Sequence, residues 1–123
     1  MRPIEGLSVL ITGGGSGIGA GTARYLCARG ARVTIAGRRR EKLDAVAAAI
    51  GPNCATVTGD VTVADDRRRM IDAALAHGDG LQALVNNAGN MVRGPITDLD
   101  EARVLALFNE NVVSAMMLTG LAT

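Results

Sequence analysis

Short apolar runs alternate along the chain with longer stretches in which apolar residues recur at helical spacing. Leu7–Ile11 is apolar on both sides of the pleat, which is typical of a strand buried in a parallel sheet. Glu41–Ile50 instead gathers its large apolar residues on one face, which indicates a helix. The full pattern predicts strands over Leu7–Ile11, Arg32–Ala36, Ala55–Thr58 and Leu81–Val85, and helices over Gly17–Arg29, Glu41–Ile50, Ala64–His77 and Asp100–Leu121.

A strand followed by a helix, repeated four times, favours an α/β fold with parallel strands and right-handed crossovers. We expect the strand order 3-2-1-4, which would leave the apolar strand Leu81–Val85 at an open edge. The chain has 123 residues, enough for one domain, and no linker or low-complexity segment divides it. We therefore predict a single domain over residues 1–123.

Composition and charge exclude several classes of function. The formal net charge is +1 and the only aromatic residues are Tyr25 and Phe108, so a nucleic-acid partner is not expected. One histidine and two distant cysteines make no metal site. Cys27 and Cys54 form no CxxC pair and indicate reduced thiols in a cytoplasmic protein. The sequence shows no signal peptide and no unbroken apolar run of about 18 residues, so we expect no membrane partner.

Five glycines fall within Thr12–Gly19, between the first predicted strand and the first predicted helix. Glycine lets a pyrophosphate approach the backbone, and the helix N-terminus offers it N–H donors. The run fits either Gly-x-Gly-x-x-Ala from Gly15 to Ala20 or Thr-Gly-x-x-x-Gly-x-Gly from Thr12 to Gly19. A loop that only turns the chain needs fewer glycines. We therefore predict a dinucleotide site in a Rossmann-like, doubly wound sheet.

The residues after the second predicted strand indicate which dinucleotide binds. An acidic residue there would accept a hydrogen bond from the adenosine ribose of NAD. The sequence instead has Arg38, Arg39 and Arg40 after Gly37. Guanidinium groups favour a 2′-phosphate, so we predict NADP in preference to NAD. The alternative is a solvated basic start to the next helix, which explains Arg40 better than Arg38.

Three motifs occur in order at the ends of the predicted strands. They are Thr12–Gly19, Asp60-Val61 after the third strand, and Asn86-Asn87-Ala88-Gly89 after the fourth. Together they resemble the short-chain dehydrogenase/reductase family, over essentially the whole chain. The resemblance implies that Asn86 braces the central strands. It also implies a cofactor-binding set of Thr12, Gly13, Gly15, Ser16, Gly17, Ile18, Gly19, Arg38, Arg39, Asp60, Val61, Asn87, Ala88 and Gly89.

The resemblance further implies hydride transfer between NADP(H) and a small-molecule alcohol or carbonyl substrate. In the family, an Asn in the last predicted helix holds a water of the proton relay, and Asn111 matches it best, with Asn109 as a neighbouring candidate. The family also uses a Ser and a Tyr-x-x-x-Lys pair, and that pair is missing. The only tyrosine, Tyr25, is followed four residues later by Arg29.

We therefore expect a truncated form that holds the first four strands of the fold and is inactive alone. The alternative is a non-catalytic NADP(H)-binding module or pseudoenzyme. The apolar face of the last predicted helix would lack partners, and the family commonly uses this helix in dimers, which implies a homo-oligomer. That face comprises Val104, Leu107, Phe108, Met116, Met117 and Leu118.

Overall fold

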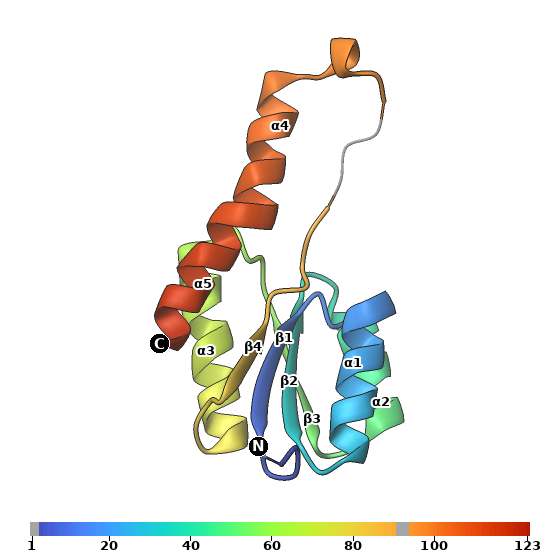
Figure 1. The fold of residues 1–123 in the computed structure, drawn as a ribbon. Coiled ribbons are helices and arrows are strands. Elements are labelled where there is room, and N and C mark those ends of the chain that lie inside the picture. Colours follow the sequence, from blue (N-terminus) through green and yellow to red (C-terminus); the bar gives the residue numbers. More distant parts are fainter. Residues whose placement is uncertain (1–2, 91–93) are drawn as a thin grey trace.

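The computed structural model describes residues 3–90 and 94–123 and contains one parallel sheet (Figure 1). Its strands are β1 (Ser8–Thr12), β2 (Arg32–Gly37), β3 (Cys54–Thr58) and β4 (Ala83–Val85). They lie in the order β3-β2-β1-β4, and each neighbouring pair is parallel. The Rossmann-like α/β fold and the strand order predicted from the sequence are therefore confirmed, and β4 is an edge strand of the described sheet.

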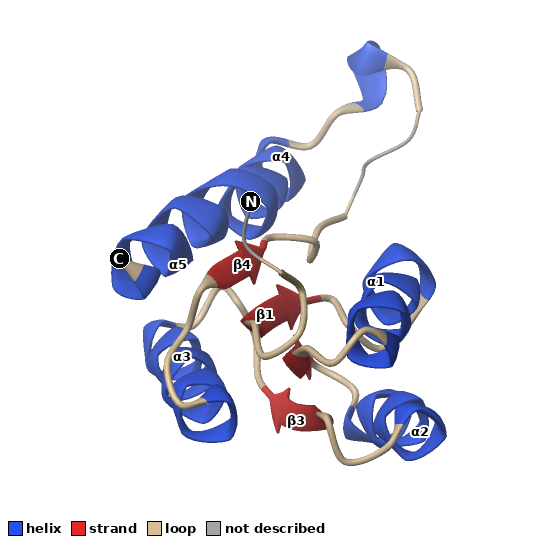
Figure 2. Cartoon of the chain, turned by 60° about the horizontal axis from the view of Figure 1, so that its bottom comes forward, coloured by secondary structure: helices blue, strands red, loops and turns tan. Residues whose placement is uncertain are grey.

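Helices cover both faces of the sheet (Figure 2). α1 (Gly17–Ala28) and α2 (Arg40–Ile50) lie on one face, and α3 (Ala64–Gly78) lies on the other. Successive side chains of a strand point to opposite faces. Val9 and Ile11 of β1 accordingly join the core under α1 and α2, whereas Leu10 joins the core under α3. This two-sided burial explains why the first strand is a continuous apolar run rather than an alternating one.

The fourth strand is shorter than the sequence predicts, since it begins at Ala83 instead of Leu81. The backbone N–H of Ser8 donates to the side-chain Oε1 of Gln82 at 2.7 Å, and the N–H of Gln82 donates to the carbonyl of Ser8 at 3.0 Å. A side-chain amide therefore replaces a backbone carbonyl at the start of the ladder, and regular strand pairing begins one residue later.

The last predicted helix is a helical run in three parts. These are α4 (Glu101–Phe108), the π-helical segment η2 (Asn109–Val113) and α5 (Ser114–Ala122), preceded by the 3₁₀ turn η1 (Ile96–Asp98). α5 packs beside α3, whereas α4 extends away from the sheet (Figure 1). π-Helical turns are rare and occur frequently at functional sites.

Much of this helical run is apolar and exposed. Phe108, Met116 and Met117 are exposed as expected, but Leu118 is 1% exposed and packs in the core under α3, so the expectation that it lacks partners is wrong. By length and composition alone, Glu101–Ala122 is long and apolar enough to cross a membrane; its mean hydropathy is 1.4, and its 18-residue window is 11% buried. The prediction that no segment spans a membrane rested on the lack of an unbroken apolar run of about 18 residues.

Candidate functional site

A cavity of about 300 Å³ opens at the carboxyl ends of the strands, where open parallel sheets bind ligands. Nine of the predicted cofactor-binding residues line it: Gly13, Gly15, Ser16, Arg38, Arg39, Asp60, Val61, Ala88 and Gly89. Sequence reasoning did not select six others: Ala36, Gly37, Lys42, Leu43, Gly59 and Glu110. The motifs chosen from the sequence therefore meet at one place, although they lie up to about 75 residues apart in the chain.

The loop after β1 requires glycine at defined positions. Gly13 has a φ of +66°, and a Cβ built on it would lie 2.9 Å from the Asn87 Nδ2. A Cβ on Gly19 would lie 2.3 Å from the carbonyl oxygen of Gly13. These two residues are glycines of the Thr-Gly-x-x-x-Gly-x-Gly register. The structure therefore favours that register over Gly15 to Ala20, the alternative that the sequence left open.

Thr12 and Asn87 lie outside the cavity lining and connect the loop after β1 to the loop after β4. The buried Thr12 Oγ1 accepts hydrogen bonds from the backbone N–H groups of Asn87 at 3.0 Å and Ala88 at 2.9 Å. The Asn87 side chain donates to the carbonyl of Gly13 at 3.1 Å. Asn86 was expected to brace the central strands, but its amide donates to Thr119 of α5 at 3.2 Å. The structure thus assigns the bracing bonds to Thr12 and Asn87.

The N-terminus of α1 faces the cavity with its backbone donors available. Ser16 is the N-cap residue and lines the cavity, and within the described residues its side chain makes no capping hydrogen bond. The first N–H groups of a helix have no intrahelical partner and suit an anion. Of the predicted residues on this helix, Ile18 is 80% exposed and lies outside the cavity lining, as does Gly17. The uncapped turn fits a pyrophosphate.

The end of β2 gives the cavity a cationic edge. Arg38, Arg39 and Lys42 all line it, whereas Arg40 lies outside the lining and pairs with Asp44 of its own helix at 3.6 Å. The alternative interpretation, a solvated basic helix start, therefore applies to Arg40. Lys42 was not predicted as a site residue, although its position about one helical turn beyond Arg38 and Arg39 indicates that it can reach the same cavity.

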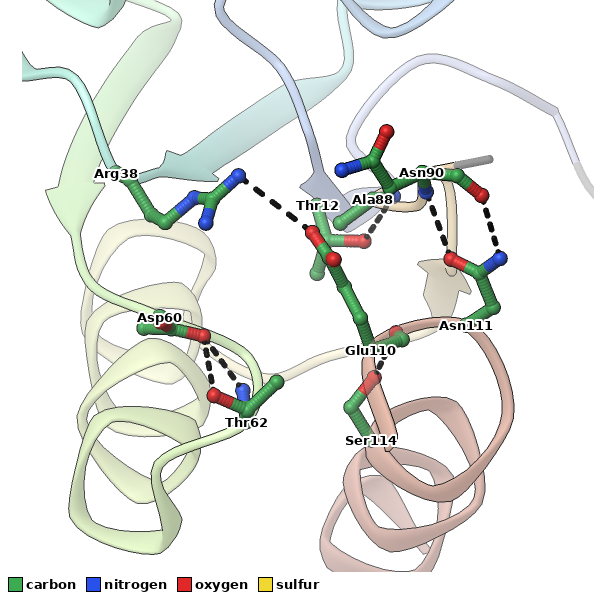
Figure 3. Close-up of polar contacts among 9 residues, drawn as sticks. All are labelled: Thr12, Arg38, Asp60, Thr62, Ala88, Asn90, Glu110, Asn111 and Ser114. Carbon is green, nitrogen blue, oxygen red and sulfur yellow. Dashed lines mark hydrogen bonds and ion pairs between the residues drawn. The ribbon is translucent and has the colours of Figure 1, made fainter. Parts of the chain in front are cut away.

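Two carboxylates line the same cavity and act on Arg38 (Figure 3). Asp60 follows β3, and its Oδ1 accepts hydrogen bonds from the hydroxyl of Thr62 at 2.7 Å and from its backbone N–H at 2.9 Å. These bonds, with a smaller contribution from the charge of Arg38, hold the pKa of Asp60 below its usual value. Glu110 of η2 reaches Arg38, with 3.5 Å between its Oε1 and an Arg38 terminal nitrogen. No motif pointed to Glu110, because the π-helical turn decides where its side chain points.

Asn111 binds the loop that follows β4 through both ends of its side-chain amide (Figure 3). Its Oδ1 accepts from the backbone N–H of Asn90 at 2.7 Å, and its Nδ2 donates to the Asn90 carbonyl at 2.6 Å. A Cβ on Gly89 would lie 2.9 Å from the Asn111 Oδ1. This contact accounts for a glycine at the end of the Asn-Asn-Ala-Gly motif. The side chain of Asn111 thus holds the helical run against the cavity rim.

Repeated β-α units with a glycine-rich turn at the carboxyl edge of the sheet define a Rossmann-like α/β domain. The short chain dehydrogenase profile matches residues 8–123. The chain therefore belongs to the short-chain dehydrogenase family, and the resemblance inferred from the three motifs is confirmed.

Individual relatives agree with this assignment. An oxidoreductase of Sarocladium schorii is 38% identical over 112 residues, which cover 91% of this chain and 45% of that protein. The crystal structure of a glucose/ribitol dehydrogenase of the family from Brucella melitensis superposes with a TM-score of 0.92 at 29% identity, covering 99% of this chain and 53% of that one. A 3-ketoacyl-(acyl-carrier-protein) reductase from the same organism, complexed with NADH, gives 0.90 at 28% identity, covering 95% and 49%. The chain spans about half the length of these relatives.

Proposed function

We propose that the chain supplies the cofactor-binding half of an oxidoreductase that transfers hydride between NADP(H) and an alcohol or carbonyl substrate. Family membership supports a nicotinamide cofactor. The observation that carries the choice of NADP is the cationic edge, in which Arg38, Arg39 and Lys42 line the cavity directly after β2. A 2′-phosphate is favoured by guanidinium groups at this place, where an acidic residue would repel it.

The remaining site residues receive roles by their position. Gly13, Gly15 and the uncapped N-terminus at Ser16 would hold the pyrophosphate, and Asp60 with Val61 would contact the adenine. Ala88 and Gly89 would lie along the cofactor, with the carbonyl chemistry supplied by the nicotinamide itself. Asn111 would hold a water of the proton relay, in addition to binding Asn90.

These 123 residues contain no Tyr-x-x-x-Lys pair of the kind that the family uses for proton transfer. Tyr25, the only tyrosine, lies in α1 with its ring 3.5 Å from the Arg29 guanidinium, and it is half exposed. We expect the chain to bind NADPH and to leave it unoxidised when carbonyl compounds are added. NADPH-dependent carbonyl reduction by the pure chain would contradict this. Turnover by a longer form would separate the enzyme from the alternative, a non-catalytic NADP(H)-binding module.

Calorimetric titration with NADPH and NADH tests the cofactor assignment. Two neighbouring variants are matched, since each removes one guanidinium: Arg38→Gln inside the cavity and Arg40→Gln outside it. We expect Arg38→Gln to weaken NADPH binding about tenfold or more, because charge-assisted hydrogen bonds are lost, and to change NADH binding less than twofold. Arg40→Gln should change neither. A wild-type chain that prefers NADH would refute the assignment.

A further inference from the structure

Glu110 brings a negative charge into the part of the cavity where the sequence predicts only positive ones. It lines the same cavity as Arg38, Arg39 and Lys42, and its side chain is 19% exposed. Arg38, with which Glu110 forms an ion pair, is the more exposed of the two side chains, at 64%. The carboxylate therefore comes from the last helical run, more than 70 residues beyond β2 in the sequence, and points toward Arg38 (Figure 3).

Three local contacts fix the position of Glu110. The segment η2 is π-helical, which turns Glu110 and Asn111 toward the body of the domain. Asn111 is held by both bonds to Asn90, and the Ser114 hydroxyl donates to the carbonyl of Glu110 at 2.5 Å. Hydrogen bonds thus hold in place the backbone segment from which the Glu110 carboxylate reaches Arg38.

Arg38 consequently interacts with two carboxylates. Glu110 forms the ion pair, and the charge of Arg38 also acts on Asp60. A 2′-phosphate that hydrogen-bonds to Arg38 must either displace Glu110 or share one guanidinium with it. In both cases Glu110 offsets part of the attraction between Arg38 and the phosphate, which carries a charge of about −1.5 to −2. The uncharged ribose hydroxyl of NADH meets no such opposition.

We propose that Glu110 is a specificity-determining residue that competes with the cofactor 2′-phosphate for Arg38. It thereby lowers the preference for NADP(H) below the preference that Arg38, Arg39 and Lys42 alone would give. This inference rests on the proposed NADP(H) site. It adds a residue outside the β2 end that sets the balance between the two dinucleotides.

The test compares adenosine 2′,5′-bisphosphate with adenosine 5′-monophosphate, which differ only in the 2′-phosphate. Both are titrated calorimetrically at one fixed salt concentration into the wild-type chain and into Glu110→Gln, with NADPH and NADH as the full-length ligands. Asp72→Asn is the control for loss of one negative charge, because Asp72 is exposed on α3 and outside the cavity lining. Glu110→Ala is a second variant subject to the same expectations. Arg38→Gln with and without Glu110→Gln completes a double-mutant cycle.

We expect Glu110→Gln to tighten binding of the bisphosphate and NADPH about three- to tenfold, since a partly exposed charge interaction is removed. The monophosphate and NADH should change less than twofold, and the gain should disappear in the Arg38→Gln background. The inference is overturned if the gain is absent, if it is equal for both nucleotides, or if it persists without Arg38. A wild-type chain that binds none of the four ligands would overturn the proposed function together with this inference.

Discussion

Gly19 offers a sharp test of the loop that precedes α1. It is buried, and a Cβ at this position would lie 2.3 Å from the carbonyl oxygen of Gly13 and 2.7 Å from the Asn87 Nδ2. Ordinary contact begins at 3.4 Å, so Gly19→Ala requires the backbone of Gly13 to move by about 1.1 Å. Gly21, two residues along the same helix, is exposed and has nothing within 4 Å of its built Cβ.

These contacts predict opposite signs for the two alanine variants. In an exposed helix interior, alanine is better than glycine by about 0.5–1 kcal/mol, and Gly21→Ala should gain that stability. Gly19→Ala gains the same propensity but incurs an overpacking cost of about 1–3 kcal/mol or more against a backbone atom that cannot rotate away. We expect it to be destabilised by about 1–2 kcal/mol. Because Gly13 lines the cavity, we also expect NADPH binding to weaken about tenfold or more.

Urea unfolding followed by circular dichroism measures the stability of both variants, with unchanged m-values confirming a common unfolding transition. Calorimetry with NADPH measures binding. The reasoning is refuted if Gly19→Ala is as stable as the wild type and binds NADPH equally well. It is also refuted if Gly21→Ala loses as much stability as Gly19→Ala, since the two would then share a cause other than the contact with Gly13.

Two further predictions concern buried polar groups. Thr12→Val should lower the free energy of unfolding by about 1–3 kcal/mol, because it leaves the N–H groups of Asn87 and Ala88 without their acceptor. Thr12→Ser keeps the hydroxyl and should lose less stability. Equal losses for the two variants in urea unfolding would argue against the role of the hydroxyl. Burial, with a smaller effect from Cys27, raises the pKa of Cys54 to about 12, so the thiol ionises first in the unfolded chain. Its contribution to stability should be complete below about pH 9 and be lost as pH rises toward 12, by at most about 1.4 kcal/mol per pH unit. Unfolding measured at pH 8 and pH 10 should therefore show a smaller loss in Cys54→Ala than in the wild type, and equal slopes would exclude this cause.

The fold was predictable because its signals are local. Continuous apolar runs on buried parallel strands and one-sided apolar faces on helices fix the type of each element. The order of the elements then limits the topology to very few choices. The glycine-rich loop and Arg38 could also be placed, since each follows directly after a strand whose carboxyl end is at the site. Asp60 was placed by the same argument.

The remainder depends on contacts between distant segments. The π-helical turn of η2 is one residue wider than an α-helical turn and has no signature in composition. The direction of the Glu110 side chain and the hydrogen bonds of Asn111 could therefore not be derived from residue spacing. Asn86 and Asn87 likewise bind different segments, since Asn86 donates to Thr119 of α5 and Asn87 donates to the carbonyl of Gly13. This difference depends on α5 lying against the end of β4. Leu118 looked unpartnered for the same reason, because α3 provides its packing surface.

The Thr12 hydroxyl has a consequence for the order in which the protein becomes competent to bind a ligand. Its two acceptor bonds are to backbone groups 75 and 76 residues later in the chain. At synthesis rates of about 5–20 residues per second, the glycine loop is made on the order of 4–15 seconds before the segment that supports it. During that interval β1 can pair with β2, but the wall formed by Ala88 and Gly89 does not yet exist. The nascent chain therefore carries its glycine-rich turn before the cavity that this turn lines has formed.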